Sequence, residues 1–302
     1  MSSIAYVTDQ QMIEYHRLCG NSDVNFWRLS SRAGFSDFRR GDLLFFYAYG
    51  HTIRKKGLVG YAHFEGSVQL TLDEMWKKFG TRNGYATKKR LEEAICLAAR
   101  DGEVPETMNC LLLSDCVYFS SPVYPEDVGL SINEKLESYT YLDRNDPSVT
   151  VRILRMAEEI GIDNWSASQN FEPDTIFLLD EVRQMLALMA RQQPQDSHTQ
   201  SERKRIRKMI RPLKEEGYEL IRGSDYDLFR VEGESVTIAL PFAAQSSDRA
   251  EQIQRILGKM TWYRLMSMRL GLRGGTPKFE ILVEEQEEQK EFLLNAAKNV
   301  GV

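Results

Sequence analysis

The sequence predicts a mixed α/β chain built from two domains, and three observations carry this prediction. Its 302 residues exceed the roughly 250–300 at which a single core usually stops growing. Apolar residues make up 42% and charged residues 27%, which excludes a disordered chain, a collagen and a coiled-coil rod. Segments with helical periodicity also alternate with short β-type runs along the whole length.

In the first part of the chain, caps and turns mark where the elements begin and end. Asp9 and Thr71 precede apolar-periodic segments and are typical helix N-caps, and Gly41-Asp42 indicates a turn. Strands are predicted at Ile4–Thr8, Phe26–Ser30, Leu43–Ala48, Leu58–Glu65, Asn109–Ser114 and Cys116–Val123. Helices are predicted at Gln10–Leu18, Leu72–Phe79, Thr87–Arg100, Val149–Ile160 and Pro173–Met189.

A polar, proline-containing stretch at Arg191–Ser201 predicts the main domain boundary. The segments after it predict the order α-β-β-β-α-β and a last helix. Their bounds are Glu202–Glu216, Tyr218–Gly223, Tyr226–Val231, Ser235–Pro241, Asp248–Leu270, Lys278–Glu285 and Glu287–Asn299. We therefore expect an N-terminal domain over residues 1–145, a helical connector and linker over 146–201, and a C-terminal domain over 202–302.

Three N-terminal motifs carry a family resemblance: NFWRLSS at 25–31, RRGDLLFFYAY at 39–49 and KKGLVGYAHFE at 55–65. They resemble the EVE branch of the PUA-like superfamily, whose members show an early Trp, a "GD-hydrophobic-FY" strand and a "G-hydrophobic-VG-A" strand. Leu112–Val123 resembles a closing strand of such barrels. The resemblance covers residues 4–145. It implies a small β-barrel with flanking helices that binds nucleic acid and accepts one extruded, often modified, base.

The residue types in these motifs suit such a pocket, because stacking and edge hydrogen bonds recover the cost of extruding a base. Candidate base-binding residues are Trp27, Tyr47 and Tyr49 for stacking, with Ser30 and Ser31 at the base edge. Candidate phosphate-binding residues are Arg39, Arg40, Arg54, Lys55 and Lys56. Their contacts would make binding fall with salt. The alternative is that Trp27 and Tyr47 are core residues and the cations form a solvated rim.

The segment WKKFGTRNGY at 76–85 places a basic helix end beside a glycine-containing loop. Backbone N–H groups of such a loop can bind a phosphate, with Arg82 as the candidate cation. The same pattern is typical of a plain connection between two helices.

The C-terminal segment GYELIRGSDYDLF at 217–229 resembles the restriction-endonuclease-like PD-(D/E)XK core over about residues 202–300. The resemblance places Asp227, or Asp225, at the metal-binding Asp. Ala239 and Pro241 stand where the second carboxylate and the lysine belong. Because the chemistry needs two carboxylates for Mg²⁺ and a lysine near the attacking water, we expect an inactive domain. The exception is a replacement by one of Glu232, Glu234, Glu251 or Lys259. No cofactor is expected, and Mg²⁺ belongs only to the nuclease alternative.

The run RKRIRKMIRPLK at 203–214 holds seven basic residues and no acid. On a helix, its apolar residues form one face and its basic residues cover the rest. Candidate phosphate-binding residues are Arg203, Arg205, Arg207 and Lys208. The alternative is a solvated helix face.

Net charge is −5, yet the acid is concentrated in residues 101–190, which carry 17 acidic and 5 basic side chains. We expect a cytoplasmic protein with reduced cysteines that binds nucleic acid, with DNA favoured over RNA and RNA left as the alternative. A protein partner or a second copy is also expected, and no membrane contact. Family analogy favours modification-dependent restriction or phage defence. The alternatives are an active metal-dependent nuclease and a protein-interaction subunit without a nucleic-acid role.

Overall fold

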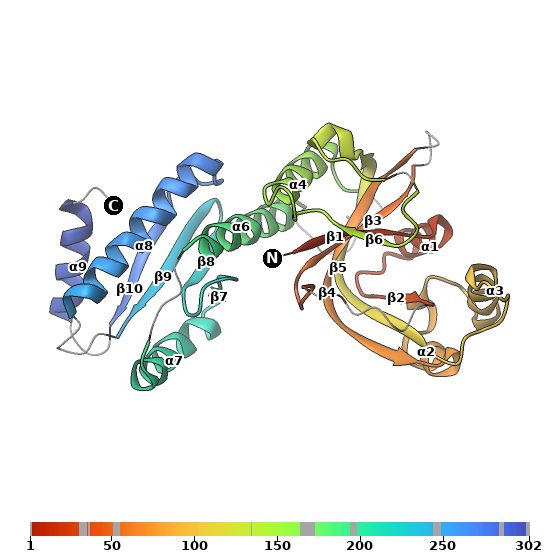
Figure 1. The fold of residues 1–302 in the computed structure, drawn as a ribbon, viewed down its shortest axis with the longest axis horizontal. Helices are drawn as coiled ribbons and strands as arrows, with labels where there is room; N and C mark the ends of the chain where they lie inside the picture. Colours follow the sequence, from red (N-terminus) through yellow and green to blue (C-terminus); the bar gives the residue numbers. More distant parts are fainter. Residues whose placement is uncertain are drawn as a thin grey trace. The chain divides into compact units, whose positions relative to one another are not determined.

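The computed structural model describes residues 2–29, 35, 37–50, 55–133, 135–163, 173–193, 198–243, 249–283 and 287–299. The chain divides into two compact units, Met1–Phe177 and Leu178–Val302. The division falls inside helix α6 (Pro173–Arg191), whereas the sequence analysis set 146–201 apart as a connector. We call the two parts unit 1 and unit 2, and Figure 1 shows the elements of each.

Unit 1 is organised by a six-stranded sheet of order β2-β5-β4-β3-β1-β6. Its strands are β1 (Ser3–Val7), β2 (Val24–Arg28), β3 (Leu43–Tyr49), β4 (Lys56–Leu70), β5 (Met108–Val123) and β6 (Tyr139–Tyr141). β1 runs parallel to β3, and the other neighbours are antiparallel. Within the described residues the ladder has β2 and β6 as its edges, so no closed barrel is found. β6 was not predicted, since its three residues follow a segment with loop composition.

Two bulged strands, β4 and β5, give this sheet its curvature (Figure 1). The predicted strand end at Gly66 is wrong, because β4 continues to Leu70 across a register shift beside Gly66. The two strands predicted around Asp115 are likewise one strand, β5. Asp115 sits within it with a φ of 51°. Each break in the sequence pattern therefore marks a bulge, which bends a strand without ending it.

Helices cover both faces of the unit 1 sheet, and the first two of them begin at the predicted caps Asp9 and Thr71. They are α1 (Gln10–Cys19), α2 (Leu72–Phe79), α3 (Lys88–Ala98), α4 (Val149–Ile160) and two 3₁₀ turns, η1 (Gly80–Asn83) and η2 (Pro125–Val128). Asp9 accepts from the Met12 N–H at 2.8 Å, and Thr71 forms a capping box with Glu74. Alternate residues of β3 enter two different hydrophobic clusters. That burial on both faces explains its nearly continuous apolar sequence.

Unit 2 has a four-stranded sheet of order β10-β9-β8-β7, with β9 and β10 parallel. After α6 come α7 (Gln200–Glu215), β7 (Glu219–Leu220), β8 (Leu228–Glu232), β9 (Ser235–Phe242), α8 (Arg249–Leu270), β10 (Lys278–Val283) and α9 (Glu287–Asn299). The predicted order α-β-β-β-α-β is present. β7 is much shorter than the predicted Tyr218–Gly223. Ile206 and Ile210 of α7 pack against Leu228 and Ala239, which fixes the helix on the sheet.

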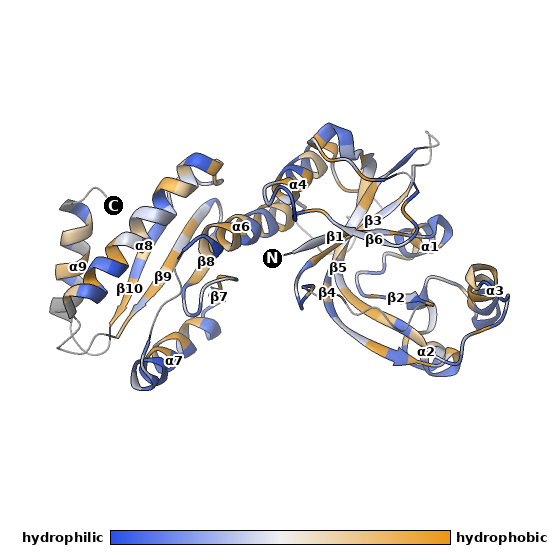
Figure 2. Cartoon of the chain, in the orientation of Figure 1, coloured by the Kyte–Doolittle hydropathy of each residue, from blue (hydrophilic) through white to orange (hydrophobic). Residues whose placement is uncertain are grey.

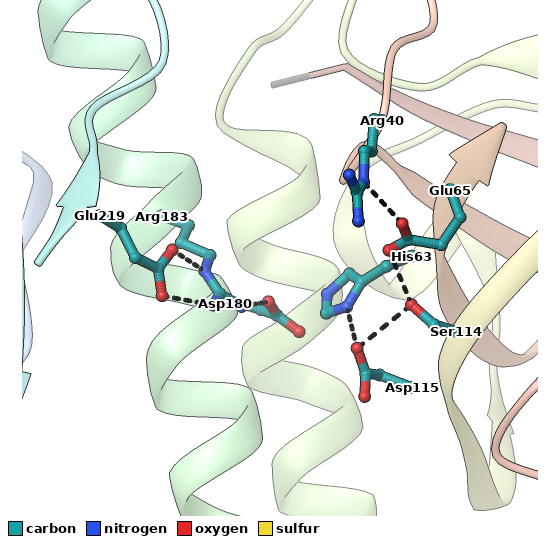
Figure 3. A network of polar contacts seen from close by, with 8 residues as sticks. All are labelled: Arg40, His63, Glu65, Ser114, Asp115, Asp180, Arg183 and Glu219. Carbon is teal, nitrogen blue, oxygen red and sulfur yellow. Dashed lines mark hydrogen bonds and ion pairs between the residues drawn. The ribbon is translucent and has the colours of Figure 1, made fainter. Parts of the chain in front are cut away.

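A half-buried guanidinium, that of Arg183, joins α6 to β7 within unit 2 (Figure 3). Arg183 donates to both carboxylate oxygens of Glu219, at 2.9 and 2.6 Å, and to Asp180 at 2.9 Å. Burial opposes its charge, but these bonds outweigh that effect and raise the pKa of Arg183. These bonds hold β7 against α6, and we assign the three side chains a role in the fold.

The four cysteines are free thiols, two of them buried. Among the helices that the structure describes, none is long and apolar enough to span a bilayer.

Candidate nucleic-acid interface

Helix α7 begins at a well-formed cap. The Thr199 hydroxyl accepts from the Glu202 N–H, and the Glu202 carboxylate accepts from the Thr199 N–H at 2.8 Å. Glu202 also accepts from the Gln252 amide at 2.6 Å. Burial by itself would raise the pKa of Glu202, but these hydrogen bonds lower it. The cap fixes where the helix starts, and hence which basic residues share a face.

The basic residues of α7 divide between solvent and an open groove. The helix is coloured largely hydrophilic in Figure 2, and its apolar residues Ile206 and Ile210 lie in the core. A groove of about 650 Å³ follows one side of the helix. Its lining residues are Arg203, Arg207, Ile210, Lys214, Leu220, Asp225 and Tyr226. Three cations and one carboxylate therefore face the same open space.

The groove cations are not neutralised by carboxylates. Arg203 donates through Nε to the His198 carbonyl at 3.1 Å, which orients its side chain. Within the described part of the chain, Arg207 and Lys214 form no ion pair. Asp225 is exposed at the opposite wall. The groove thus carries a positive side and a polar, aromatic side.

The sequence-predicted cations of α7 do not act as one group. Arg203 and Arg207 line the groove, while the guanidinium of Arg205 donates to the Ala243 carbonyl at 2.8 Å and serves the fold. Lys208 is exposed on another side of the helix. The sequence analysis missed Lys214 and Tyr226 as site residues. Helical spacing from Arg203 and Arg207 pointed to Lys214, but nothing local pointed to Tyr226.

A second basic region lies at the β3–β4 hairpin of unit 1. Tyr49 is 47% exposed, whereas Tyr47 is 4% exposed and belongs to the core. The Lys56 ammonium lies 5.5 Å from the centroid of the Tyr49 ring and 6.0 Å from that of Tyr47. Lys55 pairs with Glu126 at 3.1 Å. Tyr49 and Lys56 are therefore the accessible pair, and Arg54 lies outside the described residues.

Trp27 lies far from these tyrosines along the sheet. It pairs with Cys110 of β5, which in turn pairs with Val68 of β4. Tyr47 pairs with Leu58 of β4. Val68 and Leu58 are separated by about 30 Å of strand at roughly 3.3 Å per residue. Strand pairing thus separates Trp27 from Tyr47 and Tyr49 along the sheet, and the base-binding roles of these three residues stay a prediction. Ser30 and Ser31 lie outside the described residues.

The glycine-containing loop after α2, residues 80–84, is held in place by hydrogen bonds of Asn83 and contacts Trp27. Asn83 is fully buried and donates to the carbonyls of Met75 and Gly80, at 3.2 and 2.7 Å. It also accepts from the Asn25 amide at 2.8 Å, and its carbonyl accepts from the Trp27 indole at 3.3 Å. The loop is therefore a fixed junction between α2 and β2.

The other side of this loop packs on α1. Gly84 has a φ of 90°, and a Cβ there would lie 2.3 Å from Met12 Cγ. Arg82 is exposed, with its guanidinium 5.9 Å from the centroid of the Phe79 ring. Its predicted phosphate contact stays a prediction.

The arginines before β3 stand at a turn that the backbone requires. Asp42 accepts from the Arg39 N–H at 2.7 Å, and Gly41 has a φ of 78°. The "GD" motif is thus a capped turn. The exposed Arg40 side chain donates to Glu65 at 2.6 Å (Figure 3).

Glu65 continues into a polar network that the sequence analysis did not identify. The Ser114 hydroxyl lies 3.0 Å from Glu65 and 3.3 Å from Asp115. Asp115 also contacts His63 Nδ1 at 3.1 Å (Figure 3). The serine hydroxyl thus contacts two carboxylates, which differs from the Ser–His pairing of a serine nucleophile. Residues 52 positions apart meet here, which explains why local patterns gave no signal.

In unit 2, Asp227 is buried and its carboxylate already has side-chain partners. The Lys259 ammonium lies 2.9 and 3.2 Å from its two carboxylate oxygens, and the Tyr263 hydroxyl donates to it at 3.0 Å. Of the replacements considered from sequence, Lys259 is thus the one beside Asp227. Glu251 pairs with Arg255, and Glu232 pairs with Arg230.

The partner strand supplies no second carboxylate at this point. Ala239 is fully buried in a hydrophobic cluster, and Pro241 follows it on β9. Within the described segments, no cluster of three or more His, Cys, Asp or Glu side chains could hold a metal ion. Asp227 with a lysine, a tyrosine and an alanine does not fit a Mg²⁺ site.

Comparisons with known proteins found similarity in structure. No family model and no curated protein matches this chain. The crystal structure of ASCH from Zymomonas mobilis shares 16% identity, covers 49% of this chain and 93% of its own, with a TM-score of 0.36. Two point variants of it share 14% identity, cover 50% and 51% of this chain and 97% and 95% of their own, with TM-scores of 0.37.

Proposed function

We propose that the chain is a nucleic-acid-binding protein and that the α7 groove is its main contact. The observation that carries this proposal is the set of three cations, Arg203, Arg207 and Lys214, along one open groove. Phosphate groups are the ligands that such a row of cations binds best, and the release of counterions drives the binding. A concave surface lined by one sign of charge also concentrates a polyanion more than a flat one.

The test is salt-dependent binding with a matched pair of charge reversals on α7. Arg207→Glu changes a groove residue, and Lys204→Glu changes an exposed cation that lies about 60° away from it around the helix and outside the groove lining. Fluorescence anisotropy with labelled DNA and RNA at two salt concentrations measures both. We expect wild type and Lys204→Glu to bind with a steep salt dependence, and Arg207→Glu to bind at least about tenfold more weakly. Equal loss in both variants, or no binding by wild type, would overturn the proposal.

The finer proposal is that unit 1 recognises an extruded, modified base, in the setting of modification-dependent restriction or phage defence. Its support is the exposed Tyr49 ring beside Lys56, an aromatic face next to a cation. Binding to DNA and RNA with plain, methylated and hydroxymethylated bases tests it. Tyr49→Ala should remove a preference for one base, and Lys135→Ala, an exposed cation elsewhere in unit 1, should keep it. A protein without base preference contradicts this finer proposal alone.

A metal-dependent nuclease is the alternative, and one contact favours it: a lysine beside the buried Asp227 carboxylate. The side chains around that pair lack a second carboxylate at Ala239, so we rank it below binding. Cleavage of plain and modified DNA with Mg²⁺ or Mn²⁺ separates the two. Cleavage that Asp227→Ala abolishes would establish the nuclease. A protein that neither cuts nor binds nucleic acid leaves the protein-interaction role.

A further inference from the structure

The size of the α7 groove limits which form of nucleic acid can enter it. Its volume of about 650 Å³ lies within the roughly 300–1,000 Å³ of small-molecule sites. A DNA duplex is thicker than its major groove, which alone is about 12 Å wide, so it would present its outer backbone to a site of this volume and keep its bases stacked inside. A single strand exposes its bases as well as its phosphates, so both can contact the lining residues.

The length of the cation row fits a short stretch of one strand. Along an α-helix, Arg203 and Lys214 are about 16 Å apart, with Arg207 about 6 Å from the first. These cations stand on the same side of α7, with the apolar Ile210 between them. A row of this length can contact several consecutive phosphates of one strand, whereas a single isolated phosphate would need only one or two of these cations.

The wall opposite the cations offers surfaces for bases. Leu220 is 41% exposed although it is apolar, and it lines the groove together with Tyr226. The Tyr226 ring is held edge-on to His198, with the ring centroids 5.5 Å apart. Aromatic and apolar side chains contact base faces, which a duplex keeps stacked inside and a single strand exposes.

The carboxylate of Asp225 makes the two sides of the groove differ in charge as well as in residue type. It is exposed at the wall that carries Tyr226, across from the three cations. A carboxylate repels phosphate but accepts hydrogen bonds from the exocyclic amino groups of bases. It therefore favours a strand whose backbone lies on α7 and whose bases point toward the β7–β8 connection.

We propose that the groove binds a short stretch of single-stranded nucleic acid, with phosphates on Arg203, Arg207 and Lys214 and a base against Tyr226 and Leu220. This inference rests on the proposed nucleic-acid binding. It goes further by naming the strand state and the residues that contact the base.

The experiment compares one labelled oligonucleotide as a single strand and as a duplex, in DNA and RNA forms, by anisotropy with the full chain. We expect the single strand to bind more tightly than the duplex. Tyr226→Leu should weaken single-strand binding at least about fivefold, the loss of one stacked base, and leave the salt dependence unchanged. Tyr226→Phe keeps the ring and should bind like wild type.

The outcomes separate this inference from the proposed function. Tight duplex binding with no effect of Tyr226→Leu, but with loss in Arg207→Glu, overturns the single-strand inference and keeps nucleic-acid binding. Absence of binding to either form overturns both. If Tyr226→Leu does not fold, as judged by circular dichroism, the exposed Leu220→Ser carries the same test. Unchanged single-strand affinity in that folded variant overturns the base contact.

Discussion

The cations of unit 1 and those of α7 in unit 2 occur in similar basic runs of the sequence, yet their surroundings differ. In unit 1, Arg40 and Lys55 are paired with Glu65 and Glu126. Lys56 and Arg82 lie over aromatic rings. On α7, three cations face a groove whose described residues include a single carboxylate, Asp225. The density of basic residues is therefore a poor guide to a site, and the placement of acids that are distant in sequence is a better one.

The largest expected effect tests whether the Gly80–Gly84 loop is a junction or a binding site. Asn83→Ala removes the partner of the buried Asn25 amide, of the buried Met75 carbonyl and of the partly buried Gly80 carbonyl. At roughly 1–3 kcal/mol for each orphaned group, we expect unit 1 to lose about 5 kcal/mol of stability. Amide hydrogen exchange of peptides from α2 and β2 measures this locally. Arg82→Ala, the exposed neighbour, is the control and should change little.

A stable Asn83→Ala variant that loses nucleic-acid binding would contradict the structural role. It would place a second binding site in unit 1 and remove the contrast with α7.

The next effect separates structural charges from binding charges inside unit 2. Lys259→Met leaves the Asp227 carboxylate buried without its lysine, which should cost about 4 kcal/mol of unfolding free energy. Asp227→Asn combined with Lys259→Met should recover part of that loss. Urea denaturation of the three proteins measures both. Arg207→Glu, at the groove, should by contrast lower binding with little change in stability. Full stability of Lys259→Met would show that the pair does not hold the fold.

Most elements could be predicted from the sequence because caps and periodicity are local. Asp9, Thr71 and the apolar spacing around Ile206 act within a few residues of themselves. The bulges at Gly66 and Asp115 could not be distinguished from strand ends, because a glycine or an acid interrupts the β pattern in either case. The partner strand decides between the two, and its register is not a local property.

The same difference between local and long-range signals explains which residues of the candidate site could be predicted from the sequence. Arg203 and Arg207 could be predicted from a run of like charges. The separation of Trp27 from Tyr47 could not, because it depends on which positions of β4 each strand pairs with. The engagement of Asp227 by Lys259 also joins residues 32 positions apart. Residue type identified the candidates, and strand register and helix packing decided which of them meet.

A buried histidine predicts a pH effect on the stability of unit 1. His16 is buried, and burial lowers its pKa from 6.5 to about 4. Its Nδ1 lies 3.2 Å from the Asn21 amide, which requires the unprotonated nitrogen there as acceptor. Between these two pH values the unfolded chain binds a proton and the folded chain does not, so stability falls as the pH drops from about 6.5 toward 4. The loss should approach about 3 kcal/mol.

Urea denaturation of wild type and His16→Gln across this pH range measures the difference. The variant should show a shallower loss, since its remaining slope comes from carboxylates. Parallel curves for the two proteins would show that His16 titrates normally.

The smallest effect tests directly why the unit 1 cations differ from those of α7. Hydrogen bonds from the backbone N–H of Glu126 and from Lys55 lower the pKa of the Glu126 carboxyl, so the pair stays charged at neutral pH. Both side chains are well exposed, so Glu126→Gln should leave stability unchanged. It releases Lys55 from its carboxylate, and we expect affinity for DNA to rise by about twofold, with a steeper salt dependence. Glu106→Gln, an exposed acid elsewhere in unit 1, removes the same charge without releasing Lys55. If both variants gain equally, net charge rather than pairing sets the affinity, and the contrast between the two basic regions reduces to long-range electrostatics.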